Sequence, residues 1–419
     1  MLLKSRPTVV ASLAAVAVLG LSACSSTANA GATSPASPAA SSASPAGAAS
    51  SSAPATTSST PTPTTAPVAW ATNPDDEATK VPVDTRVTAS VDQGTLTEAD
   101  LSYVSKKGNV VAVKGDMKSG TWTAGDLLEP GVTYTLALTA DDESGAATTT
   151  KRTFSTAKLT LDDQIYVAVS PRDGGTVGVG MPVIVRFDLP VTDRAAFEKH
   201  MTVTATPAQA GSWYWLNSKE AHFRPQTYWK AGSKVHVDIE TNGVKSGARF
   251  GEMSRTADFT VGRSVIAKVD LKKHQMGVYV SGKLVKTIPV TGGQPGFITR
   301  SGVKVIMDKQ TDITMKAETI GLKKGDPGYY EETPVKWALR ITNSGEFLHS
   351  APWSVKDQGH TNVSHGCTGM SDANGAWVYK NMQIGDVVET TGTDRSMTMG
   401  NGYADWNLDW ATWKKGSAL

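Results

Sequence analysis

Short stretches in which apolar and polar residues alternate constrain this chain most, because an alternation of period two is typical of half-buried β-strands. The pattern covers residues 87–91 and 134–138, and it returns at residues 183–187 and 235–239. The two pairs are separated by about one hundred residues, the size of an immunoglobulin-like sandwich. We therefore expect a mainly β protein that contains two such sandwiches in succession.

Two phenylalanines mark the ends of these units. Phe154 and Phe259 close them at corresponding places in the repeat. We place the first sandwich at residues 67–157 and the second at residues 158–262. Neither unit contains a pair of cysteines, so we expect no disulfide between the sheets of either sandwich. The second unit also carries large side chains that we interpret as packing residues: Trp213, Trp215, His222 and Trp229.

A third β-rich domain is expected over residues 263–392. Within it, Ser281-Gly282 lies between two strand patterns and predicts a tight hairpin turn. Residues 308–332 are polar and contain glycines, and a loop of this length in a compact domain is usually functional, so we expect a lid. The remaining elements are expected at residues 265–271, 276–280, 303–307, 337–341 and 346–350 as strands, 371–382 as a helix capped by Ser371 or Asp372, and 386–390 as a strand.

The C-terminal residues 393–419 form a separate, tryptophan-rich extension. Trp406, Trp410 and Trp413 have the spacing of one helical face. We interpret this stripe as a packing surface that holds the C-terminus against the body of the protein, in preference to a ligand site.

The N-terminal residues 1–23 have the features of a secretory signal. Lys4 and Arg6 precede a short apolar run that ends in Leu21-Ser22-Ala23, directly before Cys24. This ending resembles the bacterial lipobox, in which the cysteine is lipidated; an ordinary signal peptide with an incidental cysteine is the alternative. Residues 24–66 consist almost wholly of Ser, Ala, Thr, Pro and Gly, which predicts a disordered linker. We therefore expect an exported protein that is anchored by lipid to the outer face of the cytoplasmic membrane.

The charge of the chain excludes one class of partner. Charged residues make up 19% of the sequence, and the net charge is only +2. A nucleic-acid binder needs a strongly basic surface, so we expect no nucleic-acid partner.

One stretch gathers the candidates for chemistry. His349, His360 and His365 lie close before Cys367, which is one of only two cysteines in the chain. If Cys24 carries lipid, Cys367 has no disulfide partner, and a lone thiol in an exported protein suggests reactivity. A thiol nucleophile needs a nearby base, which His349 at the end of a predicted strand can supply. The backbone carbonyl of Ser350 is a candidate to orient that base.

Other roles for this stretch remain open on spacing alone. Backbone N–H groups of His365, Gly366 and Cys367 can form an oxyanion hole. A metal site at His360, His365 and Cys367 is weaker, because the chain contains no CxxC or HExxH motif. A buried, inert cysteine fits the spacing as well as catalysis does. We expect no metal and no other cofactor.

The sequence around the cysteine closely resembles the L,D-transpeptidase family, whose catalytic domain is called YkuD. The resemblance is carried by Ser364-His365-Gly366-Cys367 and by His349 within His-Ser-Ala-Pro-Trp-Ser. The whole order of signal, linker, two immunoglobulin-like domains, catalytic domain and tryptophan-rich end resembles the mycobacterial type. It implies that Cys367 attacks a peptidoglycan tetrapeptide stem, expels the terminal D-alanine and passes the acyl group to a diaminopimelate amine, which forms a 3→3 cross-link. His349 would be the base.

The resemblance also implies substrate contacts and inhibitors. It places Met307, Tyr330, Trp353, Ser364 and Gly369 along the substrate cleft, and it implies acylation of the thiol by carbapenems. Many relatives have an asparagine two residues after the cysteine, where this chain has Gly369. An L,D-carboxypeptidase or an enzyme that attaches proteins to peptidoglycan is the first alternative. A non-catalytic scaffold that binds the cell wall is the second.

Overall fold

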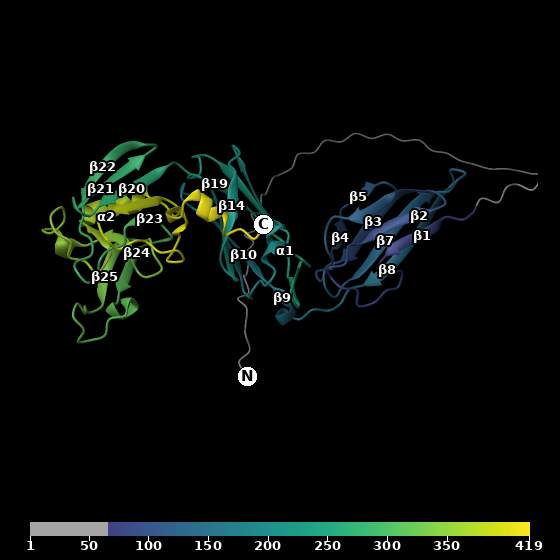
Figure 1. Cartoon of the computed structure of the whole chain (residues 1–419), viewed down its shortest axis with the longest axis horizontal. Coiled ribbons are helices and arrows are strands. Elements are labelled where there is room, and N and C mark those ends of the chain that lie inside the picture. The colour runs from purple at the N-terminus through teal and green to yellow at the C-terminus, as the bar shows by residue number, and fades with distance from the viewer. Residues whose placement is uncertain (1–65) are drawn as a thin grey trace, which may run out of the picture. The chain divides into compact units, whose positions relative to one another are not determined.

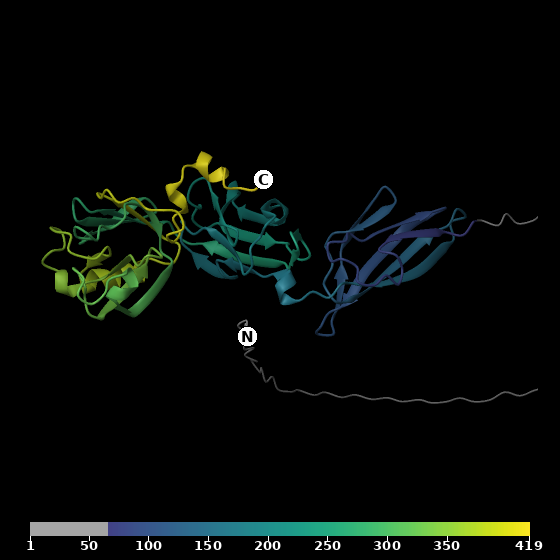
Figure 2. The same cartoon turned by 60° about the horizontal axis from the view of Figure 1, so that its bottom comes forward.

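The computed structural model describes residues 66–419, and most of their regular elements are β-strands (Figures 1 and 2). The expected mainly β class is confirmed. The first unit pairs two four-stranded sheets, β1-β2-β6-β5 and β4-β3-β7-β8. In β7 every second residue is buried, including Tyr134, Leu136 and Leu138, so the alternation in the sequence corresponds to one core face. Its strands are β1 Ala69–Asn73, β2 Thr88–Asp92, β3 Thr95–Val104, β4 Val110–Val113, β5 Gly115–Lys118, β6 Thr121–Ala124, β7 Thr133–Asp141 and β8 Ala147–Ser155.

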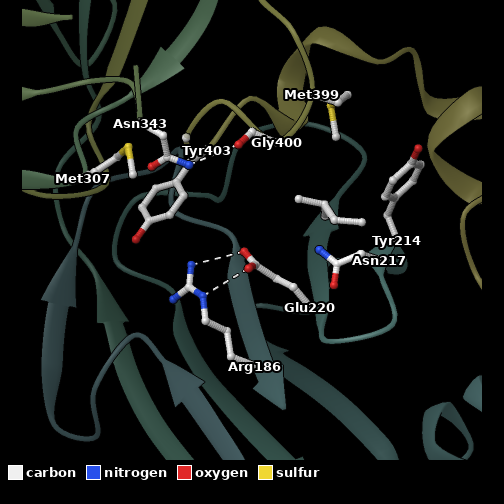
Figure 3. A pocket seen from close by; sticks show the side chains of 11 residues that line it. Arg186, Tyr214, Asn217, Glu220, Met307, Asn343, Met399, Gly400 and Tyr403 are labelled. Carbon is white, nitrogen blue, oxygen red and sulfur yellow. Dashed lines mark hydrogen bonds and ion pairs between the residues drawn. The ribbon is translucent and has the colours of Figure 1, made fainter. Parts of the chain in front are cut away.

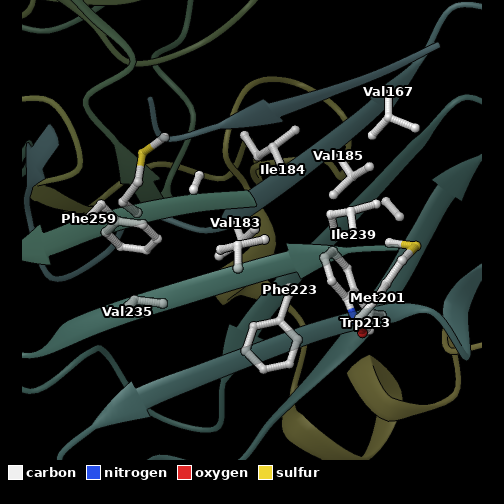
Figure 4. Close-up of a cluster of buried hydrophobic side chains, with 14 of the residues drawn as sticks. Val167, Val183, Ile184, Val185, Met201, Trp213, Phe223, Val235, Ile239 and Phe259 are labelled. Carbon is white, nitrogen blue, oxygen red and sulfur yellow. The ribbon is translucent and has the colours of Figure 1, made fainter. Parts of the chain in front are cut away.

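The second unit repeats the two-layer plan with sheets β10-β12-β15-β14 and β11-β19-β16-β13. Figure 4 shows Val183, Val185, Trp213 and Phe223 of one sheet with Val235 and Phe259 of the other in a single buried cluster. Its elements are η1 Leu161–Asp163, β9 Gln164–Ile165, β10 Val167–Ser170, β11 Gly175–Val177, β12 Val183–Phe187, α1 Arg194–Glu198, β13 Met201–Thr206, β14 Gly211–Asn217, β15 Glu220–Pro225, β16 Lys234–Ile239, β17 Lys245–Ser246, β18 Arg249–Gly251 and β19 Arg255–Val261.

The third unit contains the sheets β22-β21-β20-β28-β23 and β24-β25-β26-β27. The predicted turn joins β21 to β22, with Ser281 at φ 48° and Gly282 at φ 79°, which is the positive-φ pair of a type I′ hairpin. The Ser371 side chain accepts from the Asn374 N–H and caps α2, as its position predicts. The elements are β20 Val265–Asp270, β21 Gln275–Val280, β22 Lys283–Pro289, β23 Gly302–Val305, β24 Asp308–Met315, η2 Ala317–Ile320, β25 Thr333–Arg340, β26 Phe347–Ser350, η3 Pro352–Ser354, β27 Thr368–Met370, α2 Asp372–Asn381 and β28 Val387–Thr391.

The expected lid over residues 308–332 is wrong in its first half. Asp308–Met315 forms β24, which pairs antiparallel with β25 along its length. Gln310, Thr311 and Asp312 of this edge strand are exposed, so its sequence has the composition of a loop although all its residues except Thr311 pair with β25. The connection between the two strands is limited to residues 316–332, which begin with η2 and continue as a loop.

The tryptophan-rich extension packs back onto the second unit, but it is not one helix. Trp406 lies in η4 Asp405–Asn407, and α3 Trp410–Lys414 begins separately after Asp409 caps it. The three tryptophans surround the guanidinium of Arg224, whose carbon lies 4.7, 5.5 and 4.5 Å from the rings of Trp406, Trp410 and Trp413. A buried cation on β15 therefore organises the stripe, as cation–π attraction favours.

Two expectations concern the membrane. Across residues 66–419, no helix combines the length and the apolar character that a membrane crossing requires. The expected signal segment, Cys24 and the linker up to residue 65 lie outside the described residues.

Candidate active site

Two neighbouring parallel strands bring the predicted base and nucleophile together. The register pairs His349 of β26 with Gly369 of β27, two residues after Cys367. Phe347 lies two residues before His349 on the same face of β26, and its N–H points to the Cys367 sulfur. Both reactive side chains line one cavity of about 260 Å³. The pairing of β26 with β27 therefore brings a thiol and an imidazole from two different strands to one cavity.

His349 is oriented by the backbone next to it. Its side chain is 4% exposed, and its Nδ1 lies 2.6 Å from the carbonyl oxygen of Ser350. A carbonyl only accepts hydrogen bonds, so Nδ1 carries the proton and Nε2 is left as the basic nitrogen. Burial lowers the pKa of His349, and the Ser350 carbonyl opposes this only in part. The imidazole is therefore neutral at neutral pH and ready to accept a proton.

The Cys367 sulfur is held by the segment that leads into β26. The thiol donates to the carbonyl oxygen of Gly345, with Sγ and O 3.5 Å apart. Burial raises the pKa of Cys367 to about 12, while the N–H of Phe347 lowers it, the Glu346 carboxylate raises it and the Lys304 ammonium lowers it. The resting nucleophile is a neutral thiol, which must give its proton to a base during attack.

The turn before Cys367 is braced by two hydroxyl groups. Ser364 Oγ donates to the Cys367 carbonyl oxygen at 2.6 Å and accepts from the Gly366 N–H at 3.1 Å. Thr299 Oγ1 donates to the Gly366 carbonyl oxygen at 2.9 Å. Among the described residues, the N–H groups of His365 and Cys367 have no hydrogen-bond partner. Those two N–H groups are therefore available to an oxyanion, whereas the predicted donor Gly366 is already engaged by Ser364.

His365 stabilises the loop and is not placed as the base. Its Nε2 donates to the carbonyl oxygen of Gly328 at 2.7 Å. Its ring packs against those of Phe297 and Tyr330, with centroids 4.5 and 4.9 Å away. With Nε2 engaged and the ring in contact with two aromatic side chains, His365 fixes the end of the β24–β25 loop next to Cys367, while His349 keeps its basic nitrogen free.

Two cavities meet at Cys367. The larger one is lined by predicted substrate-binding residues: Tyr330, Trp353, Ser364 and Gly369. The smaller one, of about 130 Å³, lies against Arg340 and Phe347. Tyr330, His365 and Cys367 line both cavities, so a substrate in either one reaches the sulfur.

Gly369 occupies a position where a side chain would be crowded. Its backbone exchanges two hydrogen bonds with Thr291, at 3.0 and 2.9 Å. A Cβ on this glycine would lie 3.0 Å from Ala351 Cβ and 3.2 Å from Thr291 Cγ2. The wall of the cavity at this point is therefore formed by Ala351 and Thr291, in place of a side chain on residue 369.

The comparison with known proteins agrees with this geometry. The family model of the L,D-transpeptidase catalytic domain matches residues 264–390, and the bacterial Ig domain matches residues 78–245. L,D-transpeptidase 2 of Mycobacterium tuberculosis (strain CDC 1551 / Oshkosh) is 39% identical over 82% of this chain and 83% of its own length. The chain belongs to the L,D-transpeptidase family. L,D-transpeptidase 5 of M. tuberculosis (strain H37Rv) is 32% identical over 76% of this chain and 70% of its own.

One solved structure similar to this chain is that of LD transpeptidase LdtMt1 in complex with imipenem. It is 33% identical over 54% of this chain and 97% of that chain, with a TM-score of 0.48.

The structure places one predicted substrate contact of this L,D-transpeptidase away from Cys367. Met307 does not line either cavity at Cys367; it faces a different cavity of about 410 Å³ that also contains Arg186, Glu220 and Tyr403 (Figure 3). Met307 lies directly before the unexpected strand β24, and the residue near Cys367 is Met315, at the other end of this strand. Met315 lines both cavities.

A buried ionic cluster behind the transpeptidase site was not found from the sequence. Lys304 is fully buried, and its Nζ lies 2.8 Å from Glu346 Oε2. Arg300 donates to Glu346 Oε1 at 2.8 Å from its guanidinium and at 3.1 Å from its backbone. Glu346 precedes Phe347, so the cluster fixes the segment that holds the Cys367 sulfur. The sequence does contain a sign of this cluster, because Lys304 is the one polar residue in the predicted strand over residues 303–307.

The alternative of a metal site at His360, His365 and Cys367 has no structural support. Within residues 66–419, no three His, Cys, Asp or Glu side chains are grouped to hold a metal ion. His360 is exposed and lines neither cavity at Cys367.

Proposed function

We propose that this L,D-transpeptidase forms 3→3 cross-links between peptidoglycan stem peptides through an acyl-enzyme on Cys367. The observation that carries the proposal is the shared cavity of Cys367 and His349, in which the Ser350 carbonyl fixes the imidazole tautomer. A neutral thiol beside a neutral, oriented imidazole is the starting state of general-base-assisted acyl transfer.

In the acylation half, Cys367 gives its proton to His349 Nε2 as the sulfur attacks the carbonyl carbon of the third residue of a tetrapeptide stem. The oxyanion is stabilised by the free N–H groups of His365 and Cys367. The carbon–nitrogen bond to the terminal D-alanine breaks, and His349 returns the proton to the departing amine. A thioester on Cys367 remains.

In the second half, the amine of a diaminopimelate residue on another stem attacks the thioester carbonyl. His349 removes a proton from that nitrogen, and the carbon–sulfur bond breaks as the thiol recovers its proton. Attack by water in place of the amine would make the same site an L,D-carboxypeptidase, and attack by a protein lysine would attach that protein to the wall.

Incubation with a defined tetrapeptide-stem muropeptide tests the reaction, with the products identified by mass. Cross-linked dimer together with released D-alanine is expected for the wild type, and neither is expected for Cys367→Ala. Tripeptide without dimer would identify a carboxypeptidase. Absence of every product would favour the non-catalytic scaffold.

Carbapenems are proposed to acylate the same thiol. One relative was solved in complex with imipenem. The sulfur would attack the β-lactam carbonyl, the ring carbon–nitrogen bond would break, and the nitrogen would take up the proton. Intact-mass spectrometry after incubation with imipenem tests this, because the adduct must be absent from Cys367→Ala.

Lipid on Cys24 is proposed to anchor the protein outside the cytoplasmic membrane, with the residues up to 66 as a tether and the two sandwiches as a stalk. The lipobox-like sequence supports the anchor. Metabolic labelling with a fatty-acid analogue should mark the wild type and leave Cys24→Ala unmarked. Shortening residues 25–66 should lower cross-linking in cells and leave the activity of the purified enzyme unchanged.

A further inference from the structure

The two cavities at Cys367 differ in charge. The smaller cavity contains one permanently charged side chain, the cation Arg340, and its other lining groups include Ile313, Ile320 and Asn343. The larger cavity contains no lysine or arginine, and its charged side chain is the carboxylate of Asp357. A substrate group with a negative charge is therefore attracted to the smaller cavity and repelled from the larger one.

Arg340 is held in place without a counter-ion. It is the last residue of β25, and its guanidinium carbon lies 5.0 Å from the centre of the Phe347 ring. Its Nε atom is buried and has no hydrogen-bond partner among residues 66–419, and the ion pairs of that part of the chain do not include Arg340. A buried, unpartnered donor is costly, because it has lost water and gained nothing in exchange. Because Nε is closed off from solvent, a ligand in the cavity meets the guanidinium at its terminal nitrogens, which are not among the buried unpartnered atoms of residues 66–419.

The donor stem has an acceptor of the right kind at the right place. Its last residue ends in a carboxylate, which follows the scissile carbonyl by one residue, a spacing of about 3.8 Å between α-carbons. Arg340 and Cys367 line the same cavity, and the guanidinium acts electrostatically on the sulfur. The cavity volume of about 130 Å³ is close to the roughly 150 Å³ that holds one benzene molecule, so a single small residue fits.

We propose that Arg340 binds the C-terminal carboxylate of the departing residue of the donor stem in the smaller cavity beside Cys367. This inference rests on the proposed function. Arg340 thereby selects stems that end one residue after the scissile bond, because a longer stem would place a neutral peptide group against the guanidinium. The larger cavity, with Asp357 and no cation, is left for the amine acceptor.

Single-turnover acylation tests the proposal with two tetrapeptide donors, one with a free C-terminal carboxylate and one with a C-terminal amide. Intact mass gives the acylation rate of the full-length enzyme at several donor concentrations. A charge-assisted hydrogen bond predicts that the wild type prefers the free acid by roughly ten- to hundred-fold. Arg340→Gln should reduce this preference to about one, and Arg340→Lys should restore part of it.

Two controls separate binding of the carboxylate from other effects. Lys336→Gln removes the same charge from the same strand at an exposed position and should keep the wild-type preference. The alkylation rate with iodoacetamide, a neutral reagent, reports any change in thiol reactivity caused by losing the Arg340 charge. Such a change slows both donors equally and does not alter their ratio.

The outcomes are distinct. Equal acylation rates of the wild-type enzyme with the two donors would overturn the proposal, and this measurement uses the wild-type enzyme alone. A preference that survives in Arg340→Gln would overturn it as well. Failure of both donors to acylate a wild-type enzyme that iodoacetamide alkylates would instead refute the proposed transpeptidase reaction, and this inference with it.

Discussion

Raising the pH from about 6.5 through about 9 is expected to loosen the C-terminal extension from the second sandwich. The contact depends on His222 of β15, which is 1% exposed. Its Nδ1 lies 2.6 Å from Asp405 Oδ1 of η4, and its Nε2 lies 2.8 Å from Glu220 Oε1. Both ring nitrogens thus face carboxylates, an arrangement that favours the charged imidazolium.

The size of the effect follows from the pKa of His222. Burial lowers this pKa, but Asp405 and Glu220 outweigh burial and raise it from 6.5 to about 9. A folded-state pKa above the unfolded value gives stability that is fully present below pH 6.5 and is lost as the pH rises through about 9. At 1.36 kcal/mol per pH unit, the loss is on the order of 3 kcal/mol.

Hydrogen exchange of peptides from residues 403–413 between pH 6 and 10, corrected for the intrinsic exchange rate, measures this loss. The wild type should lose protection mainly between pH 7 and 9.5. His222→Gln keeps a similar shape without the charge, so its protection should be low at pH 6 and nearly independent of pH. Equal protection of both proteins at pH 6, or a wild-type profile that is flat to pH 10, would refute the role of the ion pair.

Further predictions concern the catalytic domain. Lys304→Met leaves the buried Glu346 carboxylate with one cation fewer, so it should cost about 3 kcal/mol of local stability, measured by hydrogen exchange of β26. Adding Glu346→Leu to this variant should recover most of the lost stability. A further loss of stability in the double variant would contradict the role of the ion pair. His349→Gln should slow single-turnover acylation by roughly 10²- to 10⁴-fold with the fold intact by circular dichroism. Because the pKa of Cys367 is raised to about 12, iodoacetamide alkylation should keep rising above pH 9; a plateau below pH 8 would show a thiolate at rest.

The sequence was sufficient to predict those structural elements that depend only on a few neighbouring residues. Ser281-Gly282 has the positive φ angles that a two-residue hairpin needs, and Ser371 caps α2 from its own position. These features depend on steric and hydrogen-bonding preferences of neighbouring residues, which act whatever the rest of the chain does.

Structural predictions failed for segments whose conformation depends on residues far away in the sequence. Polar β24 forms a strand because β25 pairs with it, and Met315 at its end lines the cavities at Cys367, whereas Met307 does not. The tryptophan stripe is broken into η4 and α3 because its rings pack around Arg224, far away in the sequence. No pattern within the stripe itself contains that information.

The sequence by itself determined the β class of this protein and predicted the repeat of its sandwiches and Cys367 and His349 as its thiol and base, because strand alternation and the residues around Cys367 are local properties of the chain. The tertiary structure alone decided that His349 keeps Nε2 free, that Gly366 has already given its N–H to Ser364, and that Arg340 and Asp357 give the two cavities opposite charges. Those features depend on which backbone and charged groups lie within a few ångströms of each other. Sheet pairing and burial set those distances, and residue spacing does not.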